Sequence, residues 1–425
     1  MNFKKHILSN GVRVILVPMK DNPTVTFAMY ACTGALYETS EQAGISHFLE
    51  HMCFKGTKKR PSPRAISLEL DSIGAKYNAY TWLEKTCYWA KAGAEHFEKI
   101  ADVISDIYLN SVFPEDEMKK EKGVVLGEID MYNDDPKSKV DDILMEHMYK
   151  GTPAARPTVG FKETVSAITR DALVAYRDSQ YKAENTVIAV AGGLSEERML
   201  EVAEKIGKKI KKGQWTEQFE TKDKKQTGPE VAIFKKETDQ AHLIIAWRSF
   251  DRFDKDVYIA NGIANILRSG MSSRLFTRFR EQMGSGYYVS AAHMPFADFG
   301  SFFVSTGTTP ERVSEIVKAI LEEITRLKNE PVKKDELLKV QEIVRSGLKM
   351  GLESSDDVME FFADQEVSKK EIKTPEEYEK IISGITAKDI MRVAKRIFQN
   401  DTMNLAVVGP LRENSELEKA LTLKE

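Results

Sequence analysis

The 425-residue chain contains only three cysteines, Cys32, Cys53 and Cys87, and no C-x-x-C pair. An odd number of cysteines at these spacings favours neither a disulfide framework nor a cysteine-based zinc site. We therefore expect three small, buried thiols in a reducing compartment. The sequence assigns no further role to Cys53, although it lies close to the histidine motif described below.

The chain also lacks an excess of charge of one sign. Its 62 Lys and Arg residues are balanced by 65 Asp and Glu residues, which gives a formal net charge of −3. Nucleic-acid-binding proteins usually carry a basic field that this composition does not supply. We expect no nucleic-acid partner.

No apolar run is long enough for a membrane span. The longest apolar stretch, residues 25–37, is interrupted by Thr26, Thr33 and Gly34 and is shorter than the roughly 18 to 20 residues that a membrane helix needs. Residues 1–10 carry two lysines and lack the apolar core of a signal peptide. We expect no membrane association and a cytoplasmic location.

What the sequence does contain is an internal repeat. At a constant offset of 217, residues 166–169 match 383–386 and residues 188–192 match 405–409, which indicates duplication. A polar, lysine-rich stretch without apolar periodicity separates the two copies and is typical of a linker. The predicted divisions are an N-terminal domain 1–212, a linker 213–228 and a homologous C-terminal domain 229–425.

Each half begins with predicted strands and continues with predicted helices. Apolar runs predict strands at 12–17, 24–32, 76–81, 86–91, 231–234 and 242–249. Apolar residues at helical spacing predict helices at 62–74, 96–110, 115–131 and 310–329. Strands mixed with helices, without a regular βαβ alternation, favour an α+β fold with α/β layers in each half.

The strongest indication of a catalytic site is the sequence His47-Phe-Leu-Glu50-His51. On a helix, these three polar side chains lie within an arc of about 60°. Two imidazoles then reach one ion, and Glu50 lies beside it as a base for bound water. Chance predicts only about 0.02 such motifs in this composition. The alternative is a pair of structural histidines that hydrogen-bond to neighbouring polar groups.

A catalytic zinc ion usually has three protein ligands and one open position. The remaining histidines offer no partner, but Glu121 and Glu128 are nearly two helical turns apart and project from one helix face. Spacing does not decide which of them is a ligand and which supports a ligand, and Glu117 shares the same face. A solvated helix face is the alternative for each glutamate taken singly.

These motifs resemble the inverzincin metallopeptidases, the group of pitrilysin, insulin-degrading enzyme and the mitochondrial processing peptidase β-subunit, whose signature is H-x-x-E-H. In that family a glutamate ligand follows the second histidine within an E-x6-E context. Here 76 residues separate His51 from Glu128, and Glu121 opens the E-x6-E pattern. The resemblance implies one Zn²⁺ per chain, held by His47, His51 and Glu128. It further implies that Glu50 is the general base and that Glu121 supports a ligand.

The resemblance extends along the whole chain. Residues 44–57 resemble the family's G-[IL]-x-H-[FL]-L-E-H-M-x-F-K-G-T block, and residues 78–81 resemble its N-A-[YF]-T strand. Because an extended peptide pairs with that strand in the family, the resemblance implies that Asn78 and Ala79 contact the substrate. Trp82 departs from the family pattern and is either a substrate-facing aromatic or a core residue.

The second half lacks the metal motif. At an offset of 218 its residues 262–270 align with 44–52, and the three motif positions hold Asn265, Arg268 and Ser269. We therefore expect no zinc there.

The second half instead contains residues 272–287, which resemble the family's S-S-R-L-F…R-E…G-Y block. A break at Gly284 and Gly286 predicts a helix that ends at Arg280 and a strand that starts near Tyr287, with both side chains facing one cavity. The resemblance implies that Arg280 and Tyr287 hydrogen-bond the substrate and the developing oxyanion.

Taken together, the resemblance implies a duplicated LuxS/MPP-like metallohydrolase fold whose two halves form a clamshell. It implies a zinc-dependent endopeptidase that cleaves peptides or unfolded polypeptide segments. Two alternatives stay open: a non-catalytic scaffold subunit and a partner-dependent subunit of a processing-peptidase-like heterodimer. One chain carries both the metal residues and the Arg/Tyr pair, which favours a self-sufficient monomer or homodimer. The isolated segment 1–212 is then expected to bind zinc but to cleave peptides poorly.

Overall fold

The computed structural model describes residues 1–221, 225–411 and 415–423, so residues 222–224 of the predicted linker lie outside the described residues. The chain packs as two compact units, each built from three separate stretches of sequence. The first unit contains residues 1–130, 156–219 and 348–375, and the second contains 131–155, 220–347 and 376–425. Within the described ranges, no helix is both long and apolar enough to cross a membrane.

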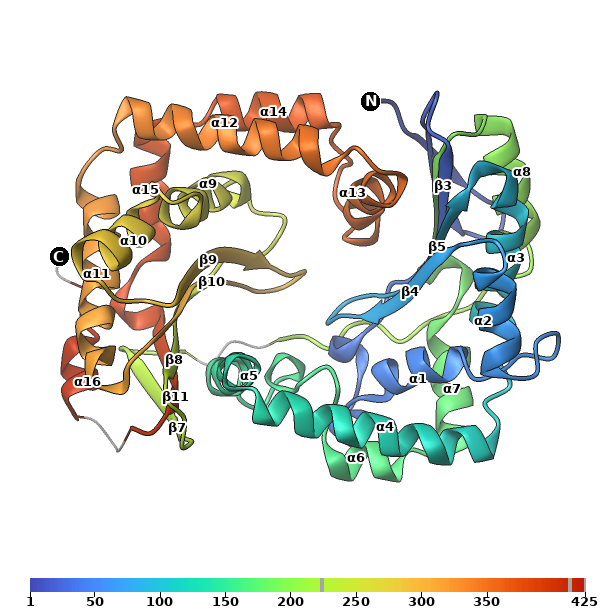
Figure 1. Ribbon diagram of the computed structural model, residues 1–425, viewed down its shortest axis with the longest axis horizontal. Helices are drawn as coiled ribbons and strands as arrows, with labels where there is room; N and C mark the ends of the chain where they lie inside the picture. Colours follow the sequence, from blue (N-terminus) through green and yellow to red (C-terminus); the bar gives the residue numbers. More distant parts are fainter. Residues whose placement is uncertain (222–224, 412–414, 424–425) are drawn as a thin grey trace. The chain divides into compact units, whose positions relative to one another are not determined.

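A six-stranded sheet forms the centre of the first unit, in the order β1-β2-β6-β3-β5-β4. The pair β2 and β6 is parallel, and the other neighbouring pairs are antiparallel. The central strand β6 is buried along its whole length, as a strand covered on both faces should be. The strands are β1 (Lys4–Ile7), β2 (Arg13–Pro18), β3 (Thr24–Ala31), β4 (Lys76–Thr81), β5 (Thr86–Gly93) and β6 (Thr186–Gly192) (Figure 1).

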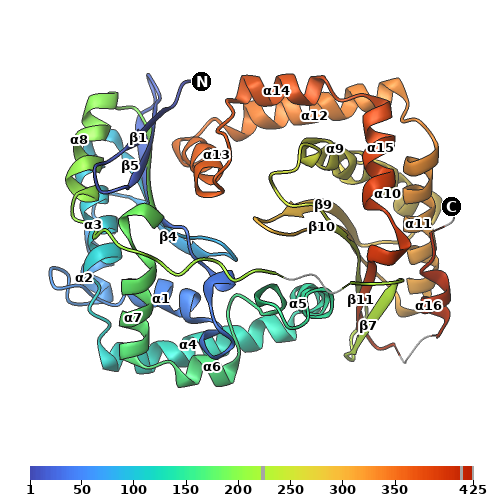
Figure 2. The same ribbon diagram turned by 180° about the vertical axis from the view of Figure 1, so that it is seen from behind.

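Most helices of the first unit pack on one face of this sheet, where they share a single apolar core. Figure 2 shows α2, α3 and α8 grouped on that side of β1 and β5. The opposite face packs on α13, through a second core that includes Ile15, Ala28 and Phe362. The helices are α1 (Ile45–Cys53), α2 (Pro63–Asp71), α3 (Phe97–Asn110), α4 (Glu115–Asp134), α6 (Lys162–Ala167), α7 (Arg170–Gln180), α8 (Glu196–Gly207) and α13 (Ser355–Val367).

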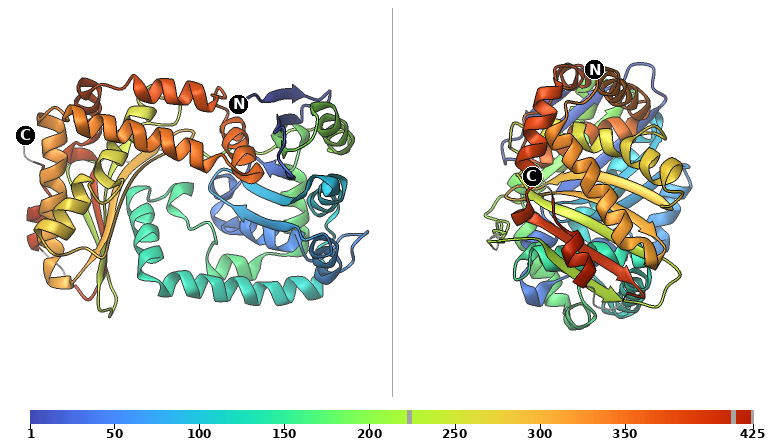
Figure 3. Two further views of the ribbon diagram at one scale, coloured as in Figure 1. Left: turned by 45° about the horizontal axis from the view of Figure 1, so that its top comes forward. Right: turned by 90° about the vertical axis from the view of Figure 1, so that its left-hand side faces the viewer.

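The second unit repeats this plan with a five-stranded sheet, in the order β7-β11-β8-β10-β9. Its strands are β7 (Glu230–Lys235), β8 (Ala241–Ser249), β9 (Tyr288–Pro295), β10 (Gly300–Thr308) and β11 (Met403–Gly409). Its helices are α5 (Pro136–Met148), α9 (Val257–Arg268), α10 (Arg274–Phe276), α11 (Val313–Asn329), α12 (Lys334–Gly351), α14 (Pro375–Ser383), α15 (Ala387–Ile397) and α16 (Ser415–Ala420). The right-hand view of Figure 3 shows helices in front of this sheet.

The duplication is visible element by element. β2 and β7 differ by 217 at both ends, and so do β6 and β11. Without β1, the first sheet has the strand order of the second. The predicted α+β fold of two homologous halves is therefore confirmed.

Each sheet packs on one helix from the other half of the sequence. α13 contacts β2, β3 and β6 of the first unit, whereas α5 contacts β7, β8 and β11 of the second unit. The divisions 1–212 and 229–425 describe the sequence repeat and stay a prediction. The compact units differ from these divisions, because α13 belongs to the first unit and α5 to the second. All three cysteines are buried and free.

Candidate metal centre

Helix α1 presents the histidine motif because its apolar side chains face the core. Phe48, Leu49 and Met52 are completely buried in the core of the first unit. A helix fixed in this way turns the remaining face toward α4 and β4. His47 and Glu50 lie on that face and are 8% and 9% exposed.

The two histidines meet Glu128 of α4. His47 Nε2 and His51 Nε2 each lie 3.7 Å from Glu128 Oε2, and one ligand atom from each of the three residues lies within 4.8 Å of the others. Ligands bound to Zn²⁺ at 2.0–2.2 Å in tetrahedral geometry are about 3.4 Å apart. The three side chains therefore fit one ion and leave a position for water.

Glu121 has a different place in the cluster. Its Oε1 lies 2.8 Å from His51 Nδ1, and its Oε2 accepts a hydrogen bond of 2.6 Å from Lys55 Nζ. A proton on Nδ1 that is donated to Glu121 leaves the lone pair of Nε2 directed toward Glu128. The geometry therefore favours Glu128 as the ligand and Glu121 as the residue that orients His51, a choice that spacing left open.

The environments of the two histidines differ. Burial, together with the neighbouring His51, lowers the pKa of His47 to about 3, so this ring is neutral at pH 7. Burial lowers the pKa of His51, but its hydrogen bond with Glu121 and the surrounding carboxylates outweigh burial and raise it. Among the described residues, no group hydrogen-bonds the buried Nδ1 of His47.

Glu50 is held by a residue of the neighbouring strand. Thr81 Oγ1, at the end of β4, donates a hydrogen bond of 2.6 Å to Glu50 Oε2. Burial raises the pKa of Glu50 although the Thr81 hydrogen bond and the charge of His51 lower it. A carboxylate with a raised pKa suits a general base that acts near neutral pH.

β4 is an edge strand and pairs with β5 on one side. Asn78 is exposed and Ala79 is half-buried, while Asn78 Oδ1 accepts a hydrogen bond from the Ala79 N–H. An edge strand of this kind offers main-chain groups to an extended peptide. The edge ends at Thr81, which contacts Glu50.

Trp82 follows β4 and is 49% exposed, so the interpretation of Trp82 as a core residue is wrong. The carbonyl of Trp82 accepts a hydrogen bond from the Ala35 N–H, and a Cβ on Gly34 would lie only 2.0 Å from that oxygen. This close approach holds the β4–β5 turn, which leaves the indole at the surface.

Arg280 and Tyr287 belong to the second unit, and both are exposed. The helix that carries Arg280 continues as a π-helical turn to Gln282, so the predicted end at Arg280 is wrong by two residues. Gly284 and Gly286 then turn the chain with φ of 58° and 84°. Arg280 Nη2 donates a hydrogen bond of 3.3 Å to the Tyr287 carbonyl.

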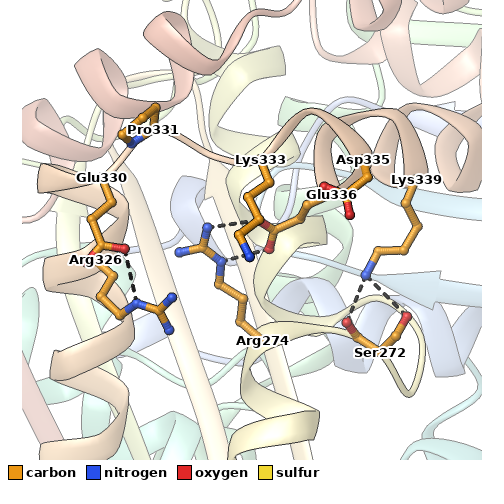
Figure 4. A pocket seen from close by; sticks show the side chains of 9 residues that line it. All are labelled: Ser272, Arg274, Arg326, Glu330, Pro331, Lys333, Asp335, Glu336 and Lys339. Carbon is orange, nitrogen blue, oxygen red and sulfur yellow. Dashed lines mark hydrogen bonds and ion pairs between the residues drawn. The ribbon is translucent and has the colours of Figure 1, made fainter.

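Arg274, from the same sequence block, lines a pocket of about 430 Å³ in the second unit (Figure 4). Its guanidinium donates two hydrogen bonds to Glu336, at 2.7 and 2.9 Å. Lys339, on the other side of the pocket, donates to Ser272. These contacts connect the segment 272–276 to α12, so Ser272 and Arg274 of the S-S-R sequence hold two elements of the second unit together.

The sequence alone does not single out Thr81 and Lys55 as neighbours of the candidate ligands. Both lie inside blocks that resemble the family, but threonine at a strand end and lysine after a helix are ordinary surface patterns. Glu117, which shares a helix face with the two other glutamates, instead pairs with Lys120.

Comparisons with known proteins identify the family of the chain. Residues 13–162 match the model of insulinase, peptidase family M16, and residues 167–344 match that of the peptidase M16 inactive domain. The chain is 34% identical to the uncharacterized zinc protease YmxG of Bacillus subtilis, over 96% of this chain and 98% of that protein. The chain belongs to peptidase family M16. An uncharacterized zinc protease of Rickettsia felis is 32% identical over the same shares.

Solved structures show the same fold for this M16 chain. A protease from Helicobacter pylori has a TM-score of 0.90 at 21% identity and covers 96% of this chain and 99% of its own. A structure from Pseudomonas fluorescens, described as a peptidase M16 inactive domain, has a TM-score of 0.89 at 19% identity, with shares of 97% and 99%. At such low identity these likenesses concern the fold alone.

Proposed function

We propose that this M16 chain is a zinc-dependent endopeptidase that cleaves peptides or unfolded polypeptide segments. The observation that carries the proposal is the cluster of His47, His51 and Glu128 with Glu50 on the same helix face. Zinc bound to these three residues would act as a Lewis acid and lower the pKa of a bound water. The names of the two bacterial relatives support zinc as the metal.

The residues around the cluster have separable tasks in this proposal. Glu50 takes a proton from the attacking water and later gives it to the leaving amine, while Thr81 holds one of its two oxygens in place. Glu121 holds the ring of His51. The substrate adds to the edge of β4 as an extended strand, next to Asn78 and Ala79.

Two donors in the second half complete the proposal. Arg280 and Tyr287 hydrogen-bond the substrate carbonyl as negative charge develops on it, which is the role that the family resemblance implies. A self-sufficient monomer or homodimer in the cytoplasm stays a prediction. The rival function, a partner-dependent or non-catalytic subunit, is distinguished by the following experiment.

The experiment uses the purified full chain, an unstructured fluorogenic peptide and metal analysis. Glu50→Gln should lower turnover by about 10³-fold or more, because the general base is lost, while one zinc per chain stays bound. Glu117→Gln is the matched control and should behave as wild type. Unchanged turnover in Glu50→Gln would refute the mechanism. Cleavage by wild type only after another subunit is added would establish the partner-dependent alternative.

A further inference from the structure

The first turn of α1 is held by a carboxylate from outside the helix. Glu38 Oε2 accepts a hydrogen bond of 2.8 Å from the Gly44 N–H, and Glu38 Oε1 accepts one of 2.8 Å from the Ser46 N–H. The first N–H groups of any helix lack partners within the helix. Gly44, the N-cap of α1, has no side chain to satisfy them, so Glu38 takes this function.

Glu38 is enclosed by the protein and is only 1% exposed. Arg156 donates a hydrogen bond of 2.5 Å to the Glu38 carbonyl, which fixes the backbone of this residue. Thr164 Oγ1 donates to the Ala43 carbonyl at 2.7 Å, directly before the helix. A Cβ on Gly160 would lie 2.3 Å from that carbonyl oxygen, so the two segments are in close contact.

The same turn of α1 is fixed by a third group. Ser46 Oγ lies 2.6 Å from Tyr176 Oη of α7, which in turn lies 3.2 Å from Thr33 Oγ1. The start of the helix is therefore held at its backbone by Glu38 and at its side by Tyr176. Ser46 directly precedes His47, so this turn sets the rotation of the helix at the first histidine.

The second half shows that the fold does not require this arrangement. At the offset of 218, Glu38 corresponds to Asp256, and α9 begins six residues earlier than α1 does. Gly262 and Ala264, which match Gly44 and Ser46, therefore lie inside α9. Their N–H groups have partners within the helix.

Asp256 serves another purpose in the second half. Its two oxygens accept hydrogen bonds of 2.8 Å from Arg392 and a further one from Arg396 of α15. Its side chain does not cap α9. Glu38 thus holds the start of α1 in the half with the histidine motif. The matching residue of the second half, Asp256, does not hold the start of α9 in this way.

We propose that Glu38 is a positioning residue that fixes the rotation and the first turn of α1, and thereby holds His47, Glu50 and His51 in the geometry of the metal centre. The proposal deepens the proposed function and rests on it. Displacements of about 1 Å at such a centre are costly, because metal ligands and a general base act only within narrow distances. Glu38 touches neither metal nor substrate in this proposal.

The test compares Glu38→Gln with Glu41→Gln in the full chain. The amide of the first variant would present an N–H group to one of the two backbone N–H groups, whereas Glu41 is exposed and accepts its hydrogen bond from Ser40. Glu38→Gln should weaken zinc binding about 10-fold in a chelator competition and speed amide hydrogen exchange in the peptide covering 43–50. It should lower kcat more than it raises KM. Glu41→Gln should match wild type in all three measurements.

Wild-type zinc affinity and hydrogen exchange in a folded Glu38→Gln variant would overturn the proposal. If that variant does not fold, Glu38→Asp replaces it, since the loss of one methylene keeps the charge but withdraws the oxygens from the two N–H groups. Wild-type values in Glu38→Asp would overturn the proposal equally. Metal affinity and hydrogen exchange do not depend on peptide cleavage. A wild-type chain that binds zinc without cleaving peptides would therefore refute the proposed function and leave the result for Glu38 standing.

Discussion

Helices α1 and α9 occupy equivalent places in the two halves, yet of these two helices only α1 carries the histidines that we propose as metal ligands. Asn265 and Ser269 of the second half stand where the first half has its two histidines. Asn265 Nδ2 donates to the Asn261 carbonyl, and Ser269 Oγ donates to Asn265 Oδ1. The side chains in the second half are thus satisfied locally, and the fold forms without the metal residues.

The facing helices differ in the same way. At the offset of 217, the positions of Glu121 and Glu128 correspond to Leu338 and Arg345 of α12. The second half therefore has no carboxylate at either of the two positions that correspond to Glu121 and Glu128. The difference between the halves teaches that the proposed chemistry depends on a small set of side chains placed on a shared scaffold.

The largest expected effect comes from giving the first half the residues of the second. His47→Asn combined with His51→Ser should abolish zinc binding and peptide cleavage while the far-ultraviolet circular dichroism stays that of wild type, because α1 keeps its apolar face. Metal analysis and peptide turnover measure the loss. The matched control, Asn265→His with Ser269→His, should still bind one zinc per chain and not two. A second bound zinc would show that two histidines on α9 are sufficient for a metal site in the second half.

A smaller effect is expected at the residue that orients His51. Glu121→Gln should weaken zinc binding about 10- to 100-fold, since Nδ1 of His51 loses its charged acceptor. Lys55→Met should weaken it less, because Glu121 then keeps its bond to His51 and loses only the ammonium of Lys55. Chelator competition gives both affinities, with Glu117→Gln as the control. An equal or larger loss in Lys55→Met would show that Lys55 has a role of its own.

Much of the fold was predictable because repeats and periodicity are local properties of a sequence. The offset of 217 predicted two related halves, and the strands and long helices fall close to the predicted ranges. The exchange of α5 and α13 was not predictable, because an amphipathic pattern shows that a helix has a partner but not which sheet it packs on. The isolated segment 1–212 would lack α13 and expose the apolar face that includes Ile15 and Ala28. Poor cleavage by this segment would therefore report on its folding and not on the absence of Arg280 and Tyr287.

For the candidate site, the sequence predicted only which side chains share a face of one helix. Spacing placed Glu50 beside the histidines and put two glutamates on one face, but it left open which glutamate meets the metal. Contacts between elements favour Glu128, and they also introduced Thr81, Lys55 and Glu38. Each of these residues acts through hydrogen-bonded partners that no recognisable motif connects to it. A pattern along one chain contains no information about such a partner.

The smallest expected effect concerns the matched carboxylates Glu38 and Asp256, whose pKa values shift in opposite directions. Burial raises the pKa of Glu38 to about 7, against the lowering effect of the hydrogen bonds from Ser46 and Gly44. The stability that Glu38 contributes is thus fully present below about pH 4.5 and is lost as the pH rises through about 7. The hydrogen bonds from Arg392 lower the pKa of Asp256 despite its burial, so its contribution is present above about pH 4 and lost below it.

Urea unfolding in the presence of a chelator measures these contributions. The unfolding free energy of wild type minus that of Glu38→Gln should fall by about 1 kcal/mol between pH 6 and pH 8. The charged and titratable groups that face Glu38 are Arg156 and Tyr176, and neither changes its charge in that interval, since burial raises the pKa of Tyr176 further above neutrality. The corresponding difference for Asp256→Asn should stay constant from pH 6 to pH 8 and shrink only in acid. If both differences in unfolding free energy had the same pH dependence, Glu38 and Asp256 would contribute to stability in the same way, against this prediction.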